Sequence, residues 1–233
     1  VADVIAIADA LGLPRFHLVV HDHGCVVGWC CAARHPERVA SYVPMSVPHP
    51  AAFAQALQSD AEQIKASQYF HTFAAVQGKS LEKFAAGITD TIYAAPGFTA
   101  EMISEYKALF SQPTALRAAL NWYNGAMEAQ LLPCPPVLPG SPYEGNAEFA
   151  AMVKNWVGSK REGIVKPPVR HLWGKTDNAL RRVAVEASVQ FCSGGYSLVV
   201  IDCGHWMLQE AGSQCVAEIL SHVRGHKIST SSL

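Results

Sequence analysis

Three side chains that could act as nucleophile, orienting acid and base occur in that order along the chain, at Asp22, Asp177 and His205. Each follows an apolar run that predicts a buried strand. Asp22 lies in His21-Asp22-His23-Gly24, where a sharp strand-to-helix turn would raise one side chain at the carboxyl end of a sheet. A carboxylate nucleophile displaces at carbon when the leaving group is good or assisted. The carboxylate therefore narrows the class of reaction, and the order nucleophile, acid, histidine along the chain is that of a catalytic triad.

The choice of acid and the absence of a metal are separate predictions. Asp202 lies close to His205 in the sequence and competes with Asp177, but the run Trp173-Gly174-Lys175-Thr176-Asp177 directly follows a predicted strand, so we favour Asp177. His21 and His23 are residues of a metal-binding type. Since no further Glu, His or Cys at ligand spacing completes a site, we predict neither a metal nor another cofactor.

The elements that must position these residues fall into two regions of alternating strand and helix. The first region predicts helix 3–11, strand 16–20, helix 26–35 and strand 40–45, and the second predicts strand 169–173, helix 180–191, strand 197–201 and helix 213–223. This alternation is typical of a parallel sheet with helices on its faces. Residues 51–122 show helical periodicity. We therefore predict a core formed by 1–50 and 166–233, with a helical cap inserted at 51–165 over the carboxyl edge of the sheet.

Composition limits the class of protein. The chain has 233 residues, half of them hydrophobic and 16% charged, which excludes disorder and fits one domain with an insertion. The net charge of −1 predicts no nucleic-acid partner, and no apolar run is long enough to predict a membrane span. Seven cysteines without a C-x-x-C pair predict free thiols and a cytoplasmic location. The sequence leaves open whether the chain forms a homodimer. Because the chain begins inside a predicted helix and without methionine, we also predict a truncated N-terminus.

Several motifs together resemble one family. They are His21-Asp22-His23-Gly24, Arg34-His35-Pro36-Glu37-Arg38-Val39, Val47-Pro48-His49-Pro50, Leu120-Asn121-Trp122-Tyr123, Trp173-Gly174-Lys175-Thr176-Asp177 and Gly204-His205-Trp206. The chain is similar to the α/β-hydrolase superfamily, in its epoxide-hydrolase-like branch with an aspartate nucleophile. The resemblance implies an α/β-hydrolase fold, a parallel-sheet core with a helical cap, and a small apolar epoxide as substrate.

The resemblance also implies a role for each residue. Asp22 would attack an epoxide carbon while the cap tyrosine, Tyr123, gives a proton to the epoxide oxygen. His205, held by Asp177, would then activate a water that hydrolyses the ester to release a diol, and the backbone N–H of His23 would form half of an oxyanion hole. The family usually presents a second cap tyrosine. Alignment places Ala66 at its position, so Tyr69 is either that second tyrosine or a packing residue.

Departures from the family pattern leave two alternatives open. His23 replaces the tryptophan that usually follows the nucleophile, and Asn124 replaces the arginine that usually follows the tyrosine. The family's early strands and its His-Gly-x-Pro loop would precede Val1. One alternative is a haloalkane or haloacetate dehalogenase that acts on a halogenated substrate with the same nucleophile. The other is an inactive, N-terminally truncated fragment.

Overall fold

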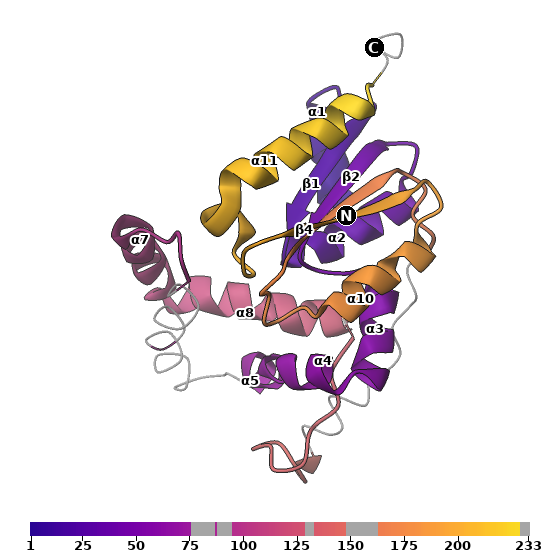
Figure 1. Cartoon of the computed structure of the whole chain (residues 1–233). Coiled ribbons are helices and arrows are strands. Elements are labelled where there is room, and N and C mark those ends of the chain that lie inside the picture. Colours follow the sequence, from indigo (N-terminus) through magenta and orange to yellow (C-terminus); the bar gives the residue numbers. More distant parts are fainter. Residues whose placement is uncertain (76–86, 88–94, 129–132, 148–162, 229–233) are drawn as a thin grey trace.

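Within the part of the chain that the structure describes, four parallel strands form one sheet at the centre (Figure 1). The computed structural model describes residues 1–75, 87, 95–128, 133–147 and 163–228. The strands lie in the order β1 (Phe16–His21), β2 (Val39–Met45), β3 (Val169–Gly174) and β4 (Tyr196–Ile201). Since every neighbouring pair is parallel, all four carboxyl ends meet at one edge. The predicted fold class is confirmed.

Helices cover both faces of this sheet, and strand β2 shows why. All seven β2 residues are buried. Tyr42 packs in a cluster with Trp29 of helix α2 (His23–Arg34), whereas Val43 belongs to a cluster with Met207 and Cys215 of helix α11 (Met207–Gly225). Alternate strand residues point to opposite faces, so a strand covered on both sides reads as an uninterrupted apolar run.

Three of the predicted helices differ clearly from the structure. Helix α2 begins at His23, three residues earlier than predicted, because the chain becomes helical immediately after Asp22. Helix α11 begins at Met207 and continues through a kink at Ala211, which has non-helical dihedral angles. The predicted helix 180–191 is instead α10 (Arg182–Ala187) followed by a turn of 3-10 helix at Ser188–Phe191. Helix α1 (Ala2–Ala10) precedes β1.

One close contact fixes helix α2 on the sheet. A Cβ atom added to Gly28 would lie 2.7 Å from the hydroxyl oxygen of Tyr42, which is too close for any larger residue. That hydroxyl donates a hydrogen bond to the carbonyl of Cys25 at 3.2 Å. The small residue therefore lets α2 approach β2, and the approach carries Asp22 to the sheet edge.

Between β2 and β3 the described residues contain helices, with one isolated bridge from Val165 to Cys192. The helices are α3 (Pro50–Ser59), α4 (Ala61–Ala66), α5 (Tyr69–Ala75), α7 (Ala100–Phe110) and α8 (Pro113–Glu128). In Figure 1, α8 runs beside the carboxyl ends of the strands, with α4 and α5 beyond it. Helix α3 packs against α10. Residues 76–86, 88–94, 129–132 and 148–162 of the predicted cap at 51–165 lie outside the described residues, and its boundaries stay a prediction.

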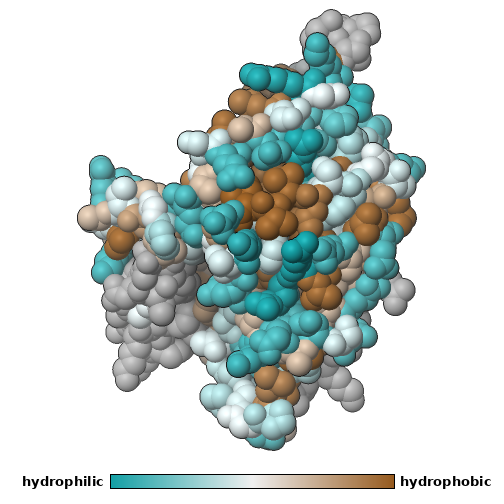
Figure 2. Space-filling view, viewed as in Figure 1, coloured by the Kyte–Doolittle hydropathy of each residue, from teal (hydrophilic) through white to brown (hydrophobic). Residues whose placement is uncertain are grey.

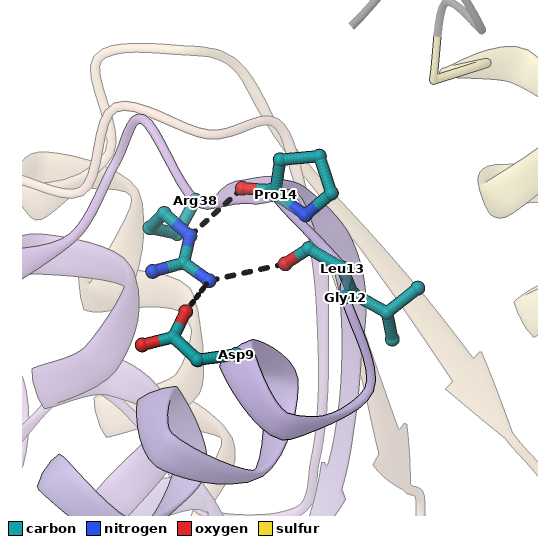
Figure 3. Close-up of a pocket in the computed structure, with 5 residues that line it drawn as sticks. All are labelled: Asp9, Gly12, Leu13, Pro14 and Arg38. Carbon is teal, nitrogen blue, oxygen red and sulfur yellow. Dashed lines mark hydrogen bonds and ion pairs between the residues drawn. The ribbon is translucent and has the colours of Figure 1, made fainter. Parts of the chain in front are cut away.

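At the opposite end of β1, Arg38 holds the loop that leads from α1 into the strand (Figure 3). Its guanidinium pairs with Asp9 at 2.6 Å and donates hydrogen bonds to the carbonyls of Leu13 and Pro14. These groups line a shallow surface hollow together with Gly12. The Nε and Nη2 atoms of Arg38 make these contacts, so the groups that line the hollow brace the loop.

The surface is mixed in character. Figure 2 shows mostly hydrophilic side chains on one face, interrupted by hydrophobic patches. Large apolar side chains that are exposed include Ile7 and Leu11 of α1 and Val216 and Leu220 of α11. Single exposed apolar residues are ordinary on folded proteins. Within the described ranges, no helix has the length and apolar character needed to cross a bilayer.

Candidate active site

The backbone at Asp22 has the conformation expected of a nucleophile elbow. Its φ of 51° and ψ of −125° are unusual for a residue other than glycine. Strand β1 ends at His21 and helix α2 starts at His23, so Asp22 alone makes the turn. Such strain persists where the surrounding structure imposes it, typically at functional sites. The structure therefore places the Asp22 carboxylate at the carboxyl edge of the sheet and at the N-terminus of α2.

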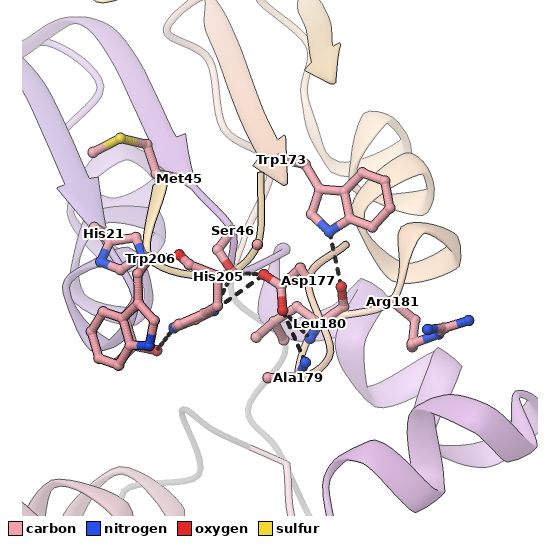
Figure 4. A network of polar contacts seen from close by, with 12 residues as sticks. His21, Met45, Ser46, Trp173, Asp177, Ala179, Leu180, Arg181, His205 and Trp206 are labelled. Atoms are coloured by element: carbon pink, nitrogen blue, oxygen red, sulfur yellow. Dashed lines mark hydrogen bonds and ion pairs between the residues drawn. The ribbon is translucent and has the colours of Figure 1, made fainter. Parts of the chain in front are cut away.

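His205 lies between Asp22 and Asp177. Its Nε2 atom is 3.6 Å from Oδ1 of Asp22, and its Nδ1 atom is 3.1 Å from Oδ2 of Asp177. Figure 4 shows the Asp177 carboxylate aimed at His205 from the loop after β3. Gly174 allows this closeness, because an added Cβ would lie 2.1 Å from the carbonyl oxygen of Gly204. The three residues singled out in the sequence are thus brought together.

The two candidate acids have different surroundings. Asp177 is 2% exposed, and its Oδ1 accepts hydrogen bonds from the backbone N–H groups of Ala179 and Leu180. The side chain of Asp202 is 86% exposed and pairs with Lys175 at 3.7 Å. The geometry therefore favours Asp177 as the acid that orients His205.

The charges of the three groups reinforce each other. Burial alone would lower the pKa of His205, but the hydrogen bonds to Asp177 and Asp22 and the charges of both carboxylates raise it to about 10. Burial would likewise raise the pKa of Asp22, yet its interaction with His205 holds that pKa well below the usual value. The two carboxylates therefore favour the protonated form of His205, and His205 in turn favours the charged form of both.

Two phenols from helices between β2 and β3 face the elbow. Tyr123 of α8 lies edge-on to the ring of His23, with centroids 4.4 Å apart, and 6.0 Å from the ring of Tyr69 in α5. The two hydroxyls form a hydrogen bond. Burial raises the pKa of both phenols, and the negative charge of Asp22 raises them further. Both tyrosines therefore stay protonated and remain hydrogen-bond donors over the physiological pH range.

Sequence reasoning missed two residues that support His205. The buried Ser46 donates a hydrogen bond to Oδ2 of Asp177 at 2.6 Å (Figure 4). Glu210 accepts hydrogen bonds from the backbone N–H groups of Gly204 and Trp206, on either side of His205. A signal for Ser46 exists only in its place at the end of a central strand. Glu210, five residues after the histidine, could have been proposed as a loop clamp.

His21 and His23 have separate surroundings. The Nε2 atom of His21 donates to the backbone carbonyl of His205 at 2.9 Å, which ties the end of β1 to the histidine loop. The ring of His23 instead contacts Tyr123 and Trp122. Across the part of the chain that the structure describes, no group of three or more His, Cys, Asp or Glu side chains is arranged to hold a metal ion.

Comparison with known proteins gives a consistent family. The model of the family described as the alpha/beta hydrolase fold matches residues 1–211. Epoxide hydrolase 2 of Caenorhabditis elegans is 28% identical over 220 residues, which cover 90% of this chain and 55% of that protein. Epoxide hydrolase 4 of Homo sapiens is 23% identical over 225 residues, covering 90% of this chain and 54% of that protein. The chain thus spans about half the length of these relatives.

Solved structures share the fold. An epoxide hydrolase from metagenomes of hot environments superposes with a TM-score of 0.77 and 23% identity, covering 97% of this chain and 73% of that one. A mutant epoxide hydrolase from Bacillus megaterium gives a TM-score of 0.70 and 19% identity, covering 95% of this chain and 74% of that one. At these identities the likeness establishes the fold.

Proposed function

Because this chain belongs to the α/β hydrolase fold family, in its epoxide-hydrolase-like branch, we propose that it opens an epoxide to a diol through an ester on Asp22. The observation that carries the proposal is the pair of hydrogen-bonded phenols, Tyr69 and Tyr123, facing a carboxylate at the elbow. An epoxide presents a carbon to the carboxylate and an oxygen to hydrogen-bond donors. The site offers one partner for each.

In the first step, an oxygen of Asp22 attacks an epoxide carbon and the carbon–oxygen bond of the ring breaks. Tyr123 donates its proton to the leaving oxygen, since an unassisted alkoxide is a poor leaving group. The hydrogen bond from Tyr69 to Tyr123 supports this donation because it stabilises the phenolate that forms. The product is a hydroxyalkyl ester of Asp22.

Formation of the ester changes His205 from an acid into a base. The ester removes the charge of Asp22, which is one of the causes that hold the pKa of His205 at about 10. The pKa of His205 falls, and the proton it releases replaces the one that the epoxide oxygen took up through Tyr123. The first step therefore produces the neutral imidazole that the second step needs.

In the second step, His205 takes a proton from water at Nε2, and the hydroxide adds to Cγ of the Asp22 ester. The backbone N–H of His23 donates to the oxyanion that forms. The bond from Cγ to the alkyl oxygen then breaks, and that oxygen takes the proton of the newly formed carboxyl group. The diol leaves, and the carboxylate and imidazolium of the free site are restored. Atoms and charges balance without a metal or other cofactor.

The test is the intact mass of the His205→Gln variant after incubation with styrene oxide. Without the base the ester cannot hydrolyse, so the protein should gain the full mass of the epoxide. The same incubation of an Asp22→Asn, His205→Gln double variant should leave the mass unchanged, because the nucleophile is absent.

Two outcomes would contradict the proposal. One is a lack of adduct from styrene oxide in folded His205→Gln protein. The other is an alkyl adduct from 1-bromobutane together with none from the epoxide, which would assign the same nucleophile to a dehalogenase.

A further inference from the structure

Ser46 occupies a strained position that its contacts hold in place. It follows β2 directly and has a φ of 75°, in the region that favours glycine. The residue is fully buried. Its backbone N–H donates to the carbonyl of Leu172 at 2.9 Å, and its own carbonyl lies 3.3 Å from Nε2 of His171. Strain of this kind persists where contacts over-determine the conformation, and it gathers at functional sites.

The Ser46 hydroxyl closes a triangle with the acid and the histidine of the site. It lies 2.6 Å from Oδ2 of Asp177 and 3.0 Å from Nδ1 of His205, while Nδ1 and Oδ2 are 3.1 Å apart. The hydroxyl has one proton, which it donates to the carboxylate. Both contacts of Nδ1 are then attractive only if Nδ1 also carries a proton, which it shares between the two oxygens.

The consequence concerns the other nitrogen of the ring. When a neutral imidazole has its proton on Nδ1, Nε2 keeps a lone pair, and Nε2 is the atom that faces Asp22 at 3.6 Å. We infer that Ser46 is a positioning residue for water activation: its hydroxyl binds Asp177 and His205 together and keeps the proton of His205 on Nδ1. This inference rests on the proposed roles of Asp22 as nucleophile and His205 as base.

The prediction is a selective loss of the second chemical step. Ser46→Gly removes the hydroxyl and relieves the backbone strain, whereas Ser46→Ala removes the hydroxyl and keeps the strain. With styrene oxide in rapid-quench experiments read by intact mass, both variants should hydrolyse the ester about 10- to 100-fold more slowly, as expected for losing a hydrogen bond to a charged group. Formation of the ester should stay within about twofold, since that step does not need a neutral His205.

Ser41 provides a matched control. It is a fully buried serine in β2, the strand that Ser46 follows, and its hydroxyl lies 2.8 Å from Nδ1 of His17, away from the candidate active site. Ser41→Ala should leave both rates within about twofold of the wild type. An equal fall of both rates in the two Ser46 variants, or an unchanged hydrolysis rate in Ser46→Gly, overturns the inference.

A second measurement needs no turnover and separates this inference from the proposed function. Nitrogen-15 NMR can read the tautomer of His205 in Asp22→Asn protein, which lacks the charge of residue 22 as the ester does. The neutral ring should carry its proton on Nδ1, and adding Ser46→Gly should give a mixture of tautomers. A proton on Nε2 while Ser46 is present, or a tautomer ratio that Ser46→Gly leaves unchanged, overturns the inference even if no epoxide reacts.

Discussion

The two halves of the candidate site are built from different interactions. On the sheet edge, Asp177 and His205 are held by directional hydrogen bonds from Ser46 and from backbone groups. In the predicted cap, Tyr123 is surrounded by rings, with Phe70 and Phe73 centroids 5.3 Å and 4.8 Å away. Hydrogen bonds fix distance and angle, whereas ring contacts tolerate small shifts. The comparison predicts that polar substitutions at the sheet edge slow hydrolysis of the ester, whereas those in the cap slow its formation.

The largest effect should come from Asp177→Asn. All four hydrogen bonds to the carboxylate come from donors: two backbone N–H groups at Oδ1, and Ser46 and His205 at Oδ2. The amide nitrogen of asparagine opposes one of these pairs in either orientation. The backbone N–H groups can only donate, whereas His205 can move its proton from Nδ1 to Nε2. With that proton on Nε2, the ring has no lone pair facing the ester and can no longer take a proton from water.

We therefore expect ester hydrolysis to slow by about 10⁴-fold in Asp177→Asn, with the ester accumulating on Asp22. The measurement is the intact mass over time with styrene oxide. The control is Asp202→Asn, which alters an exposed carboxylate paired with Lys175 and should leave the rate within about twofold. A hydrolysis rate in Asp177→Asn that matches the wild type would remove Asp177 from the proposed mechanism.

Substitutions in the cap half should slow formation of the ester instead of its hydrolysis. Tyr123→Phe keeps the ring among its aromatic neighbours but removes the proton donor, so ester formation should slow by about 10²-fold while ester hydrolysis stays nearly unchanged. Tyr69→Phe should have a smaller effect, because Tyr69 acts through its hydrogen bond to Tyr123. Rapid-quench rates of the two steps give both numbers.

Tyr106→Phe serves as the control for the cap. Its ring stacks on Phe110 within α7, with centroids 6.3 Å apart. This variant should form the ester at the wild-type rate. A larger loss in Tyr69→Phe than in Tyr123→Phe would reverse the roles assigned to the two phenols.

The sheet half of the site was predictable from the sequence because parallel strands bring their carboxyl ends to one edge. Recognising that Asp22, Asp177 and His205 each follow an apolar strand was enough to predict that they meet. The sequence could not reveal the contacts between them. Ser46 is an ordinary serine in the sequence, and its importance depends on a positive φ and on a hydroxyl direction that only the packed loops impose.

The cap half was less predictable because helices can place a side chain in more than one way. Alignment left the role of Tyr69 open, with Ala66 at the expected position. These residues are three apart, and residues at this spacing lie on one face of a helix. In the structure Ala66 ends α4 and Tyr69 begins α5, and the start of α5 directs Tyr69 to Tyr123. The break between the two short helices determines this placement, and periodicity did not predict where it falls.

The smallest expected effect concerns stability and tests the charge pairing on the sheet edge alone. In the unfolded chain His205 has a pKa near 6.5, and in the folded protein the two carboxylates raise it to about 10. The folded state therefore binds this proton more tightly, which stabilises the fold fully below pH 6.5 and progressively less as the pH rises through about 10. Between pH 6.5 and pH 10 the Tm of the wild type should fall more than that of His205→Gln. The extra fall should be about 2–4 °C for each kcal/mol of unfolding free energy that the wild type loses. Buried thiols and phenols titrate alike in both proteins, so the difference between the two curves isolates His205. Tyr123→Phe is the control and should follow the wild-type curve of Tm against pH, because its change lies in the cap. Parallel curves for the wild type and His205→Gln would show that the imidazolium pair does not stabilise the folded state.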